Sequence, residues 1–147
     1  MTAEDNVDEL IAQFDQATGR FLKGNPESTE AMWSHEQDVT LANPFSPFGP
    51  VVRGWEQVAA TGRHAASQIR DGELVDIENV MKYVTPELAY IVRIERAKAK
   101  VGGQEAITPF ILRATVIMRP EDGVWKIVHR HADPIMTAQP AESIIQQ

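Results

Sequence analysis

The second half of the chain, from Glu73 to Asp133, restricts the fold most, because it reads as one continuous series of β-strands. Four segments there are rich in Val, Ile, Thr and aromatic residues, which favour strands. They are Glu73–Val84, Leu88–Lys100, Glu105–Arg119 and Val124–Asp133. Pro- and Gly-containing turn sequences separate them. The pattern predicts a four-stranded antiparallel meander, and strands of this length predict strong twist and curl.

The preceding residues have helical periodicity. Apolar residues at three- and four-residue steps predict helices over Asp5–Leu22 and Trp55–Arg70. A shorter helix is predicted from Asn25, as N-cap, to about Trp33 or Ser34, and Val39–Asn43 is predicted to be a brief strand. Three helices followed by a meander predict an α+β domain, with the helices packed on one face of a curled antiparallel sheet.

Length and charge restrict the domain count and the class of partner. A chain of 147 residues predicts one domain, with a core over about 5–133 and a polar tail over 134–147 that contains a short helix near 141–145. The net charge of -7 disfavours nucleic acid and anionic lipid surfaces. No apolar run approaches the roughly 20 residues of a membrane-spanning helix, and the acidic N-terminus is unlike a signal peptide. We therefore expect a cytoplasmic protein without a nucleic-acid or membrane partner.

The last strand carries the candidate catalytic residues. Strand alternation places His129, His131 and Asp133 on the same face as Trp125 and Ile127, which we expect to be the inner one. There they would form the polar end of a pocket, with a histidine available as acid or base near neutral pH. Alternatively, the three form structural hydrogen bonds, or the two histidines bind a metal. No third ligand stands at a diagnostic spacing, and the chain has no cysteine, so we expect no metal and no cofactor.

Two residues of the second long strand are candidates for ligand binding. Tyr90 and Arg96 alternate with Leu88, Val92 and Ile94, the more apolar face of that strand and hence the expected inner one. A structural role is the alternative for each.

The third long strand predicts a dimer interface. One of its faces, from Phe110 to Met118, is wholly apolar and is expected to point inward. The other face is mixed and contains Arg113, and we expect Arg93 and Glu95 of the neighbouring strand to share it. A face of Ile, Val, Thr and Arg is well suited to a second subunit, so we predict a homodimer through the Arg93 and Arg113 side. The alternative is a solvated face.

A family resemblance rests on three motifs: Ala42-Asn43-Pro44, Arg53-Gly54-Trp55 and the segment 120–131, PEDGVWKIVHRH. From about Val7 to Asp133 the chain resembles the nuclear transport factor 2-like (cystatin-like) superfamily, in particular its SnoaL-like and ketosteroid-isomerase-like members. The third motif is also similar to calcium/calmodulin-dependent kinase II association domains. The resemblance implies a cone-shaped fold, a pocket between the inner sheet face and the helices, and a homodimer through the outer face.

The resemblance also implies that steroid-isomerase chemistry is not encoded. The place of the family's aspartate base is held by Asn43, the oxyanion-binding tyrosine falls near Ala17, and the protonated aspartate falls near Val116. The pocket arginine of the kinase association domains also falls at Val116. Asn43 remains a candidate for orienting a ligand carbonyl by hydrogen bonding.

The function expected from the resemblance is that of a SnoaL-like protein with a pocket for a small hydrophobic or aromatic ligand. Acid-base isomerase, polyketide-cyclase-like or dehydratase chemistry is one possibility. A non-catalytic ligand-binding or dimeric assembly module is the other, so the sequence leaves open whether the protein is an enzyme. An open cavity with unassigned density would favour ligand binding, and one filled by side chains would favour assembly.

Overall fold

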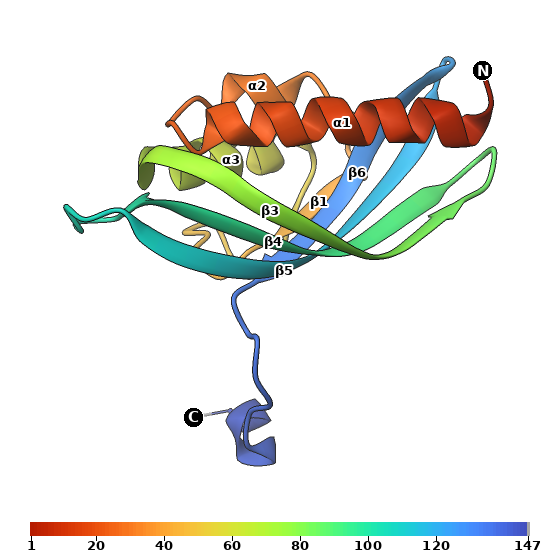
Figure 1. The fold of residues 1–147 in the computed structure, drawn as a ribbon. Helices are drawn as coiled ribbons and strands as arrows, with labels where there is room; N and C mark the ends of the chain where they lie inside the picture. Colours follow the sequence, from red (N-terminus) through yellow and green to blue (C-terminus); the bar gives the residue numbers. More distant parts are fainter. Residues whose placement is uncertain (147) are drawn as a thin grey trace.

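The computed structural model describes residues 1–146, in which helices from the first half of the chain lie across the concave face of a six-stranded sheet (Figure 1). The helices are α1 (Ala3–Phe21), α2 (Glu27–Glu30), α3 (Trp55–Ser67) and the 3-10 helix η1 (Ala141–Ile144). The strands are β1 (Thr40–Ala42), β2 (Val52–Arg53), β3 (Ile69–Val84), β4 (Ala89–Val101), β5 (Thr108–Glu121) and β6 (Val124–Asp133). The predicted α+β architecture is confirmed. The predicted polar tail ends at Gln147, which lies outside the described residues.

The sheet is mixed rather than purely antiparallel. Its order is β2-β1-β6-β5-β4-β3, and β3 to β6 form the predicted meander. β1 pairs in parallel with β6, with Thr40 opposite His129, and β2 pairs antiparallel with β1. The two-residue strand β2 is too short to give a sequence pattern, which explains why it was not predicted.

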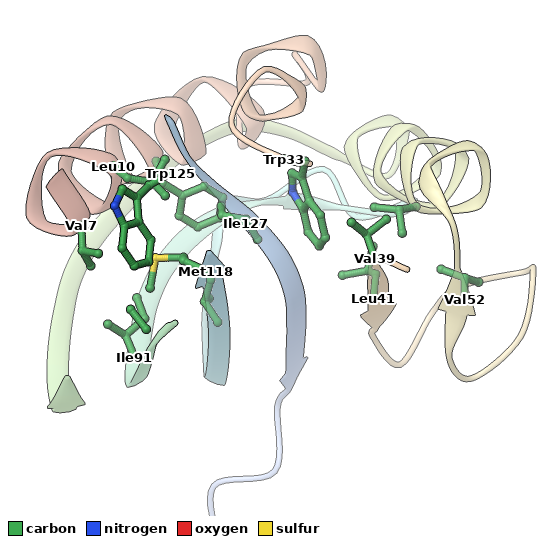
Figure 2. Close-up of a cluster of buried hydrophobic side chains, with 14 residues drawn as sticks. Val7, Leu10, Trp33, Val39, Leu41, Val52, Ile91, Met118, Trp125 and Ile127 are labelled. Carbon is green, nitrogen blue, oxygen red and sulfur yellow. The ribbon is translucent and has the colours of Figure 1, made fainter. Parts of the chain in front are cut away.

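Helix α1 supplies the main hydrophobic contact with the sheet. Thr2 and Asp5 form a capping box at its start, each side chain binding the backbone N–H of the other at 3.1 Å. Its stripe of Val7, Leu10, Phe14 and Ala17 is buried. Figure 2 shows Val7 and Leu10 packed near Trp125 of β6, with Met118 and Ile91 on the sheet below. Trp125 is buried in this cluster and therefore anchors α1 to the sheet through its large apolar surface.

The end of α1 lies so close to β3 that only glycine fits at the contact. The N–H of Gly72 donates to the Leu22 carbonyl at 3.0 Å. A Cβ at position 72 would stand 2.7 Å from that oxygen and 2.8 Å from the Ala99 Cβ. Asp71 and Gly72 lie between the predicted helix Trp55–Arg70 and the predicted strand Glu73–Val84, but they form a bulge within β3, which begins at Ile69.

The predicted inner-face position of His129, His131 and Asp133 is wrong. Ile117 of β5 faces His129, whereas the next residue, Met118, faces Ile127, so Val128 is one extra residue in β6. A bulge of this kind reverses the inward and outward alternation that follows it. Trp125 and Ile127 therefore point inward as predicted, but beyond the bulge the inward residues are Arg130 and Ala132.

The predicted orientation of β4 is also wrong. Arg93 and Glu95 point inward, with exposed fractions of 1% and 4%. Tyr90 and Arg96 point outward, opposite Ile117 and Ile111 of β5. Arg93 therefore does not share the outer face with Arg113. The more apolar face of β4 was wrongly expected to point inward. The charged residues on its other face can be buried because partners from α1 and β6 neutralise them.

After Asp133 the chain leaves the sheet and extends away from the domain to η1 (Figure 1). This short helix lies where the tail helix was predicted, one residue shorter. Within residues 1–146 no helix is both long and apolar enough to span a membrane.

Candidate ligand-binding site

A cavity of about 500 Å³ lies between the helices and the inner face of the sheet. Its walls come from the second half of α1, from α2 and α3, from the loop after β1 and from the inner faces of the four long strands. This volume is in the range of small-molecule sites. The cavity lies beside the hydrophobic core of Figure 2 and shares Phe14, Trp33, Leu41 and Val58 with it.

Most of the lining is apolar. Small residues from α3 and the strands leave the space open, and larger apolar side chains enclose it. The small residues are Ala59, Gly62, Ala65, Ala97 and Ala132. The large ones include Phe14, Phe21, Trp33, Phe45, Trp55, Ile69, Phe110 and Leu112.

Glu95 of β4 and Arg130 of β6 form the polar part of the inner sheet surface. Arg130 donates to Glu95 through both of its terminal nitrogens, Nη1 to Oε2 at 2.9 Å and Nη2 to Oε1 at 2.6 Å. The side chains are 5% and 16% exposed, so the pair is largely withdrawn from bulk water. Bidentate geometry of this kind is the strong form of the arginine–carboxylate contact.

Arg93 and Asp15 extend this pair towards α1. Arg93 Nε donates to Glu95 Oε2 at 2.8 Å, and Arg93 Nη1 lies 2.7 Å from Asp15 Oδ1. The second contact is close but not aligned as a hydrogen bond, so neither Nη group of Arg93 has an aligned acceptor. Both guanidinium groups lie over the Phe14 ring, at 5.7 Å for Arg93 and 5.9 Å for Arg130.

Arginine sets the direction of the pKa shift of Glu95, whereas burial sets that of Asp15. Burial raises the pKa of Glu95, but Arg130 and Arg93 outweigh it and lower that pKa to about 2. Burial raises the pKa of Asp15 above its ordinary value, and Arg93 opposes this rise only in part. Glu95 is therefore a permanently ionised partner of arginine at neutral pH and is poorly suited to accept a proton from a ligand.

Further polar groups line the cavity. His64 of α3 and Glu30 of α2 both belong to the lining, and Glu30 is paired with Arg63 at 2.9 Å. Trp55 also lines it and stacks on His35, with ring centroids 3.9 Å apart. Within residues 1–146 no three His, Asp or Glu side chains gather as a metal site would require.

The predicted catalytic residues lie on the outer face of the sheet. His129 Nδ1 is 2.7 Å from Thr40 Oγ1, and the pKa of His129 is lowered by burial and by His131. His131 Nε2 is 3.8 Å from Asp133, which accepts from Arg113 Nε at 2.7 Å. Burial raises the pKa of Asp133, but Arg113 outweighs it and the pKa is lowered. The three share a face as predicted, but they do not line the cavity.

The predicted ligand-binding residues are divided between the two faces. Asn43 lines the cavity, although its Oδ1 accepts from the Phe45 N–H at 3.2 Å in a local turn. Tyr90 lies on the outer face and stacks on Tyr83 of β3, with ring centroids 5.7 Å apart. Arg96 also faces outward, towards Asp76 and Glu78 at 3.4 Å.

Sequence reasoning missed Glu95 and Arg130, the two charged groups of the cavity floor. The sequence contained one indication for Glu95. Arg96, Lys98 and Lys100 alternate along β4 and so share one face, and lysines favour the solvent-exposed side. Glu95 therefore belongs to the opposite, inner face. For Arg130 the alternation pattern gave the wrong face, because nothing in the sequence marks Val128 as a bulge.

The sequence profile of the SnoaL-like domain matches residues 7–137. This chain belongs to the SnoaL-like domain family. The resemblance drawn from the three motifs is thereby confirmed. No protein with a curated description matches this SnoaL-like chain in sequence.

Solved structures similar to this SnoaL-like protein share its fold at low sequence identity. A putative dehydratase of the nuclear transport factor 2-like family from Streptomyces avermitilis has a TM-score of 0.72 and 18% identity, over 92% of this chain and 98% of that one. A nuclear transport factor 2-like superfamily protein from Salmonella enterica serovar Typhimurium has a TM-score of 0.75 and 16% identity, over 95% and 96%. A ketosteroid isomerase-like protein from Erwinia carotovora has a TM-score of 0.72 and 13% identity, over 90% and 96%. Other similar structures have a cystatin-like fold, in agreement with the predicted fold class.

Proposed function

We propose that this SnoaL-like protein binds a small, largely apolar molecule in the cavity between its helices and its sheet. One observation carries the proposal: a cavity of about 500 Å³ with a mostly apolar lining also contains a buried Glu95–Arg130 pair. An apolar enclosure with a few convergent polar groups is typical of ligand sites. The open space favours ligand binding over a module that serves assembly alone.

Gly62 allows a direct test, because it lines the cavity and a Cβ there would meet no atom within 4 Å. It stands three and four residues from the buried Val58, Ala59, Ala65 and Ala66, so a side chain would point inward. A Gly62→Leu side chain should occupy the cavity and weaken binding of the neutral fluorophore N-phenylnaphthylamine about tenfold. Fluorescence titration measures this.

Gly19→Leu is the matched control. Gly19 is also a helical glycine with no atom within 4 Å of its Cβ position, but it does not line the cavity. We expect it to leave the affinity unchanged. Equal affinities for the wild type and both variants, or no binding to any of them, would contradict the proposal.

A second candidate function is proton transfer on the bound molecule, with His64 as the acid-base group. His64 is a histidine of the cavity lining, whereas Glu95 is held ionised by arginine. The likeness to proteins described as a putative dehydratase and as ketosteroid isomerase-like adds support at the level of fold. On any substrate found for the wild type, His64→Gln should abolish turnover while N-phenylnaphthylamine affinity stays within about twofold. The catalytic role of His129, His131 and Asp133 stays a prediction, which now requires a ligand on the outer face.

We also propose that two copies pair through the outer face of the sheet, on the side of Arg113. That face carries apolar groups from β3, β4 and β5, of which Tyr83 is 51%, Met81 49% and Ile111 36% exposed. Arg113 and Asp133 on the same face provide both signs of charge, as a self-complementary two-fold interface needs.

A further inference from the structure

In the cavity floor formed by Glu95 and Arg130, the acceptor oxygens of Glu95 are occupied, whereas Arg130 has an N–H group without an acceptor among residues 1–146. The two carboxylate oxygens of Glu95 already accept three N–H groups, two from Arg130 and one from Arg93. A guanidinium has five N–H donors, and Arg130 directs one from each Nη to Glu95. Its Nε–H has no acceptor within residues 1–146. The floor therefore has a spare donor, while its acceptor is occupied.

Arg130 is held in place from both sides. Glu95 fixes its two Nη groups, and the Phe14 ring lies 5.9 Å from its central carbon. Glu95 is fixed in turn by Arg93, whose side chain is fully buried. Arg130 keeps a 16% exposed fraction and belongs to the cavity lining. A donor held in this way loses little conformational freedom when a ligand binds.

We propose that Arg130 is the recognition residue of the cavity, and that the ligand places a carbonyl or carboxylate oxygen against its free N–H edge. The ligand class is therefore an apolar, aromatic-sized molecule with one acceptor oxygen at its end, rather than a pure hydrocarbon. Arg93 and Asp15 are positioning residues that act through Glu95. This inference rests on the proposed ligand-binding function and specifies the chemical class of the ligand.

Three naphthalenes of similar size test the inference: one carries a carboxylate, one an acetyl group and one an isopropyl group. Each is titrated as a competitor of N-phenylnaphthylamine on the wild-type protein and on Arg130→Met, which keeps an apolar stem but loses the donors. A hydrogen bond to a charged group corresponds to roughly a ten- to hundredfold change in affinity. We expect the preference for at least one oxygen-bearing compound over the isopropyl compound to fall by that factor in Arg130→Met.

Arg119→Met is the matched control, because Arg119 also donates to a carboxylate through both Nη groups, to Asp38 at 2.7 and 2.8 Å, but does not line the cavity. It should leave all three affinities unchanged. Since Arg130→Met leaves Glu95 with one fewer partner, the double variant Glu95→Gln/Arg130→Met removes both charges and should lose the same preference. Arg130→Lys, with its single compact donor group, should retain only part of it.

The outcomes separate the two proposals. A preference confined to the carboxylate identifies an anionic ligand, and an equal preference for the acetyl compound identifies a neutral carbonyl; both support the inference. If Arg130→Met and the double variant keep the wild-type preference while Gly62→Leu still weakens binding, Arg130 is not the recognition residue and the binding function stands. If the wild type binds none of the compounds, or if Gly62→Leu does not weaken their binding, both the ligand-binding function and the recognition role of Arg130 are wrong.

Discussion

The carboxylate of Glu95 accepts hydrogen bonds from both Nη groups of Arg130, at 2.6 and 2.9 Å, although the two residues lie 35 positions apart. They come from β4 and β6, which are separated in the sheet by β5. Ala114 of β5 lies opposite Arg93 on one side and Ala132 on the other, and its small side chain leaves room for the pair to form across the strand. The pair thus joins three strands at the floor of the cavity.

Removing the charge of Glu95 should be strongly destabilising. Glu95→Gln leaves Arg93 and Arg130 buried without their shared carboxylate, and breaking a buried pair in this way costs about 3–5 kcal/mol. Urea denaturation of the wild type and the variant measures the difference in free energy of unfolding. Glu73→Gln is the control: Glu73 pairs with Lys98 at 3.0 Å but is 59% exposed, so we expect a loss of about 1 kcal/mol or less. Equal losses for both variants would contradict the assigned role of the buried pair.

The contribution of Glu95 should depend on pH with a definite sign. Its pKa falls from an ordinary 4.5 to about 2 on folding, so the folded state holds its proton less tightly than the unfolded chain. The stabilisation is complete above the unfolded pKa and is lost as the pH falls from about 4.5 to about 2. The difference in unfolding free energy between the wild type and Glu95→Gln should therefore shrink over this range.

Asp15 should show the opposite pH dependence to Glu95 in the same series of measurements. The pKa of Asp15 is raised by burial, so the folded state binds its proton more tightly, and this group favours folding as the pH falls. Comparison of Asp15→Asn with the wild type should give a difference that changes in the opposite direction. A gap between wild type and Glu95→Gln that is constant from neutral to acid pH would show that arginine does not depress the pKa of Glu95.

Gly72→Ala should destabilise the protein by about 1–3 kcal/mol, the usual cost of overpacking. Its Cβ would stand 2.7 Å from the Leu22 carbonyl oxygen and 2.8 Å from the Ala99 Cβ, so the end of α1 would have to move away from β3. Thermal unfolding measures the effect. Gly103→Ala, in the loop between β4 and β5, meets no atom within 4 Å and should change little. An unaltered melting temperature for Gly72→Ala would argue against this close contact.

Val92→Glu should dissociate the proposed dimer. Val92 lies half-buried at the centre of the outer face, opposite Thr115 of β5. Two new carboxylates brought together across a two-fold interface repel each other and cost desolvation. Sedimentation velocity should give the mass of one chain for this variant and of two chains for the wild type. Val51→Glu introduces the same charge at a 60% exposed loop position and should leave the mass unchanged; a monomeric wild type would refute the interface.

Local pattern predicted most of the architecture, because hydrophobic periodicity and turn residues act over a few positions. The β-favouring residues of Val124–Asp133 and the turn sequence before them gave the bounds of β6, and the apolar face of β5 was placed inward correctly, with Ala114, Val116 and Met118 buried. Boundaries were wrong where tertiary contacts overrode local pattern. The chain after α2 pairs with β6 through Met32, Ser34 and Ile127 backbone bonds, so the predicted helix to about Trp33 ends at Glu30.

Residue patterns within the chain were sufficient to predict the fold family, the order of helices followed by a meander, and the buried apolar faces of α1 and β5. Which polar residues face the cavity depends on contacts between strands. Because of the bulge at Val128, His129, His131 and Asp133 point outward and Arg130 points inward. Arg130 offsets the cost of burying the charge of Glu95. Strand phase and the burial of charge both depend on partners distant in sequence, because a carboxylate is stable in an apolar interior only where another strand places a guanidinium beside it.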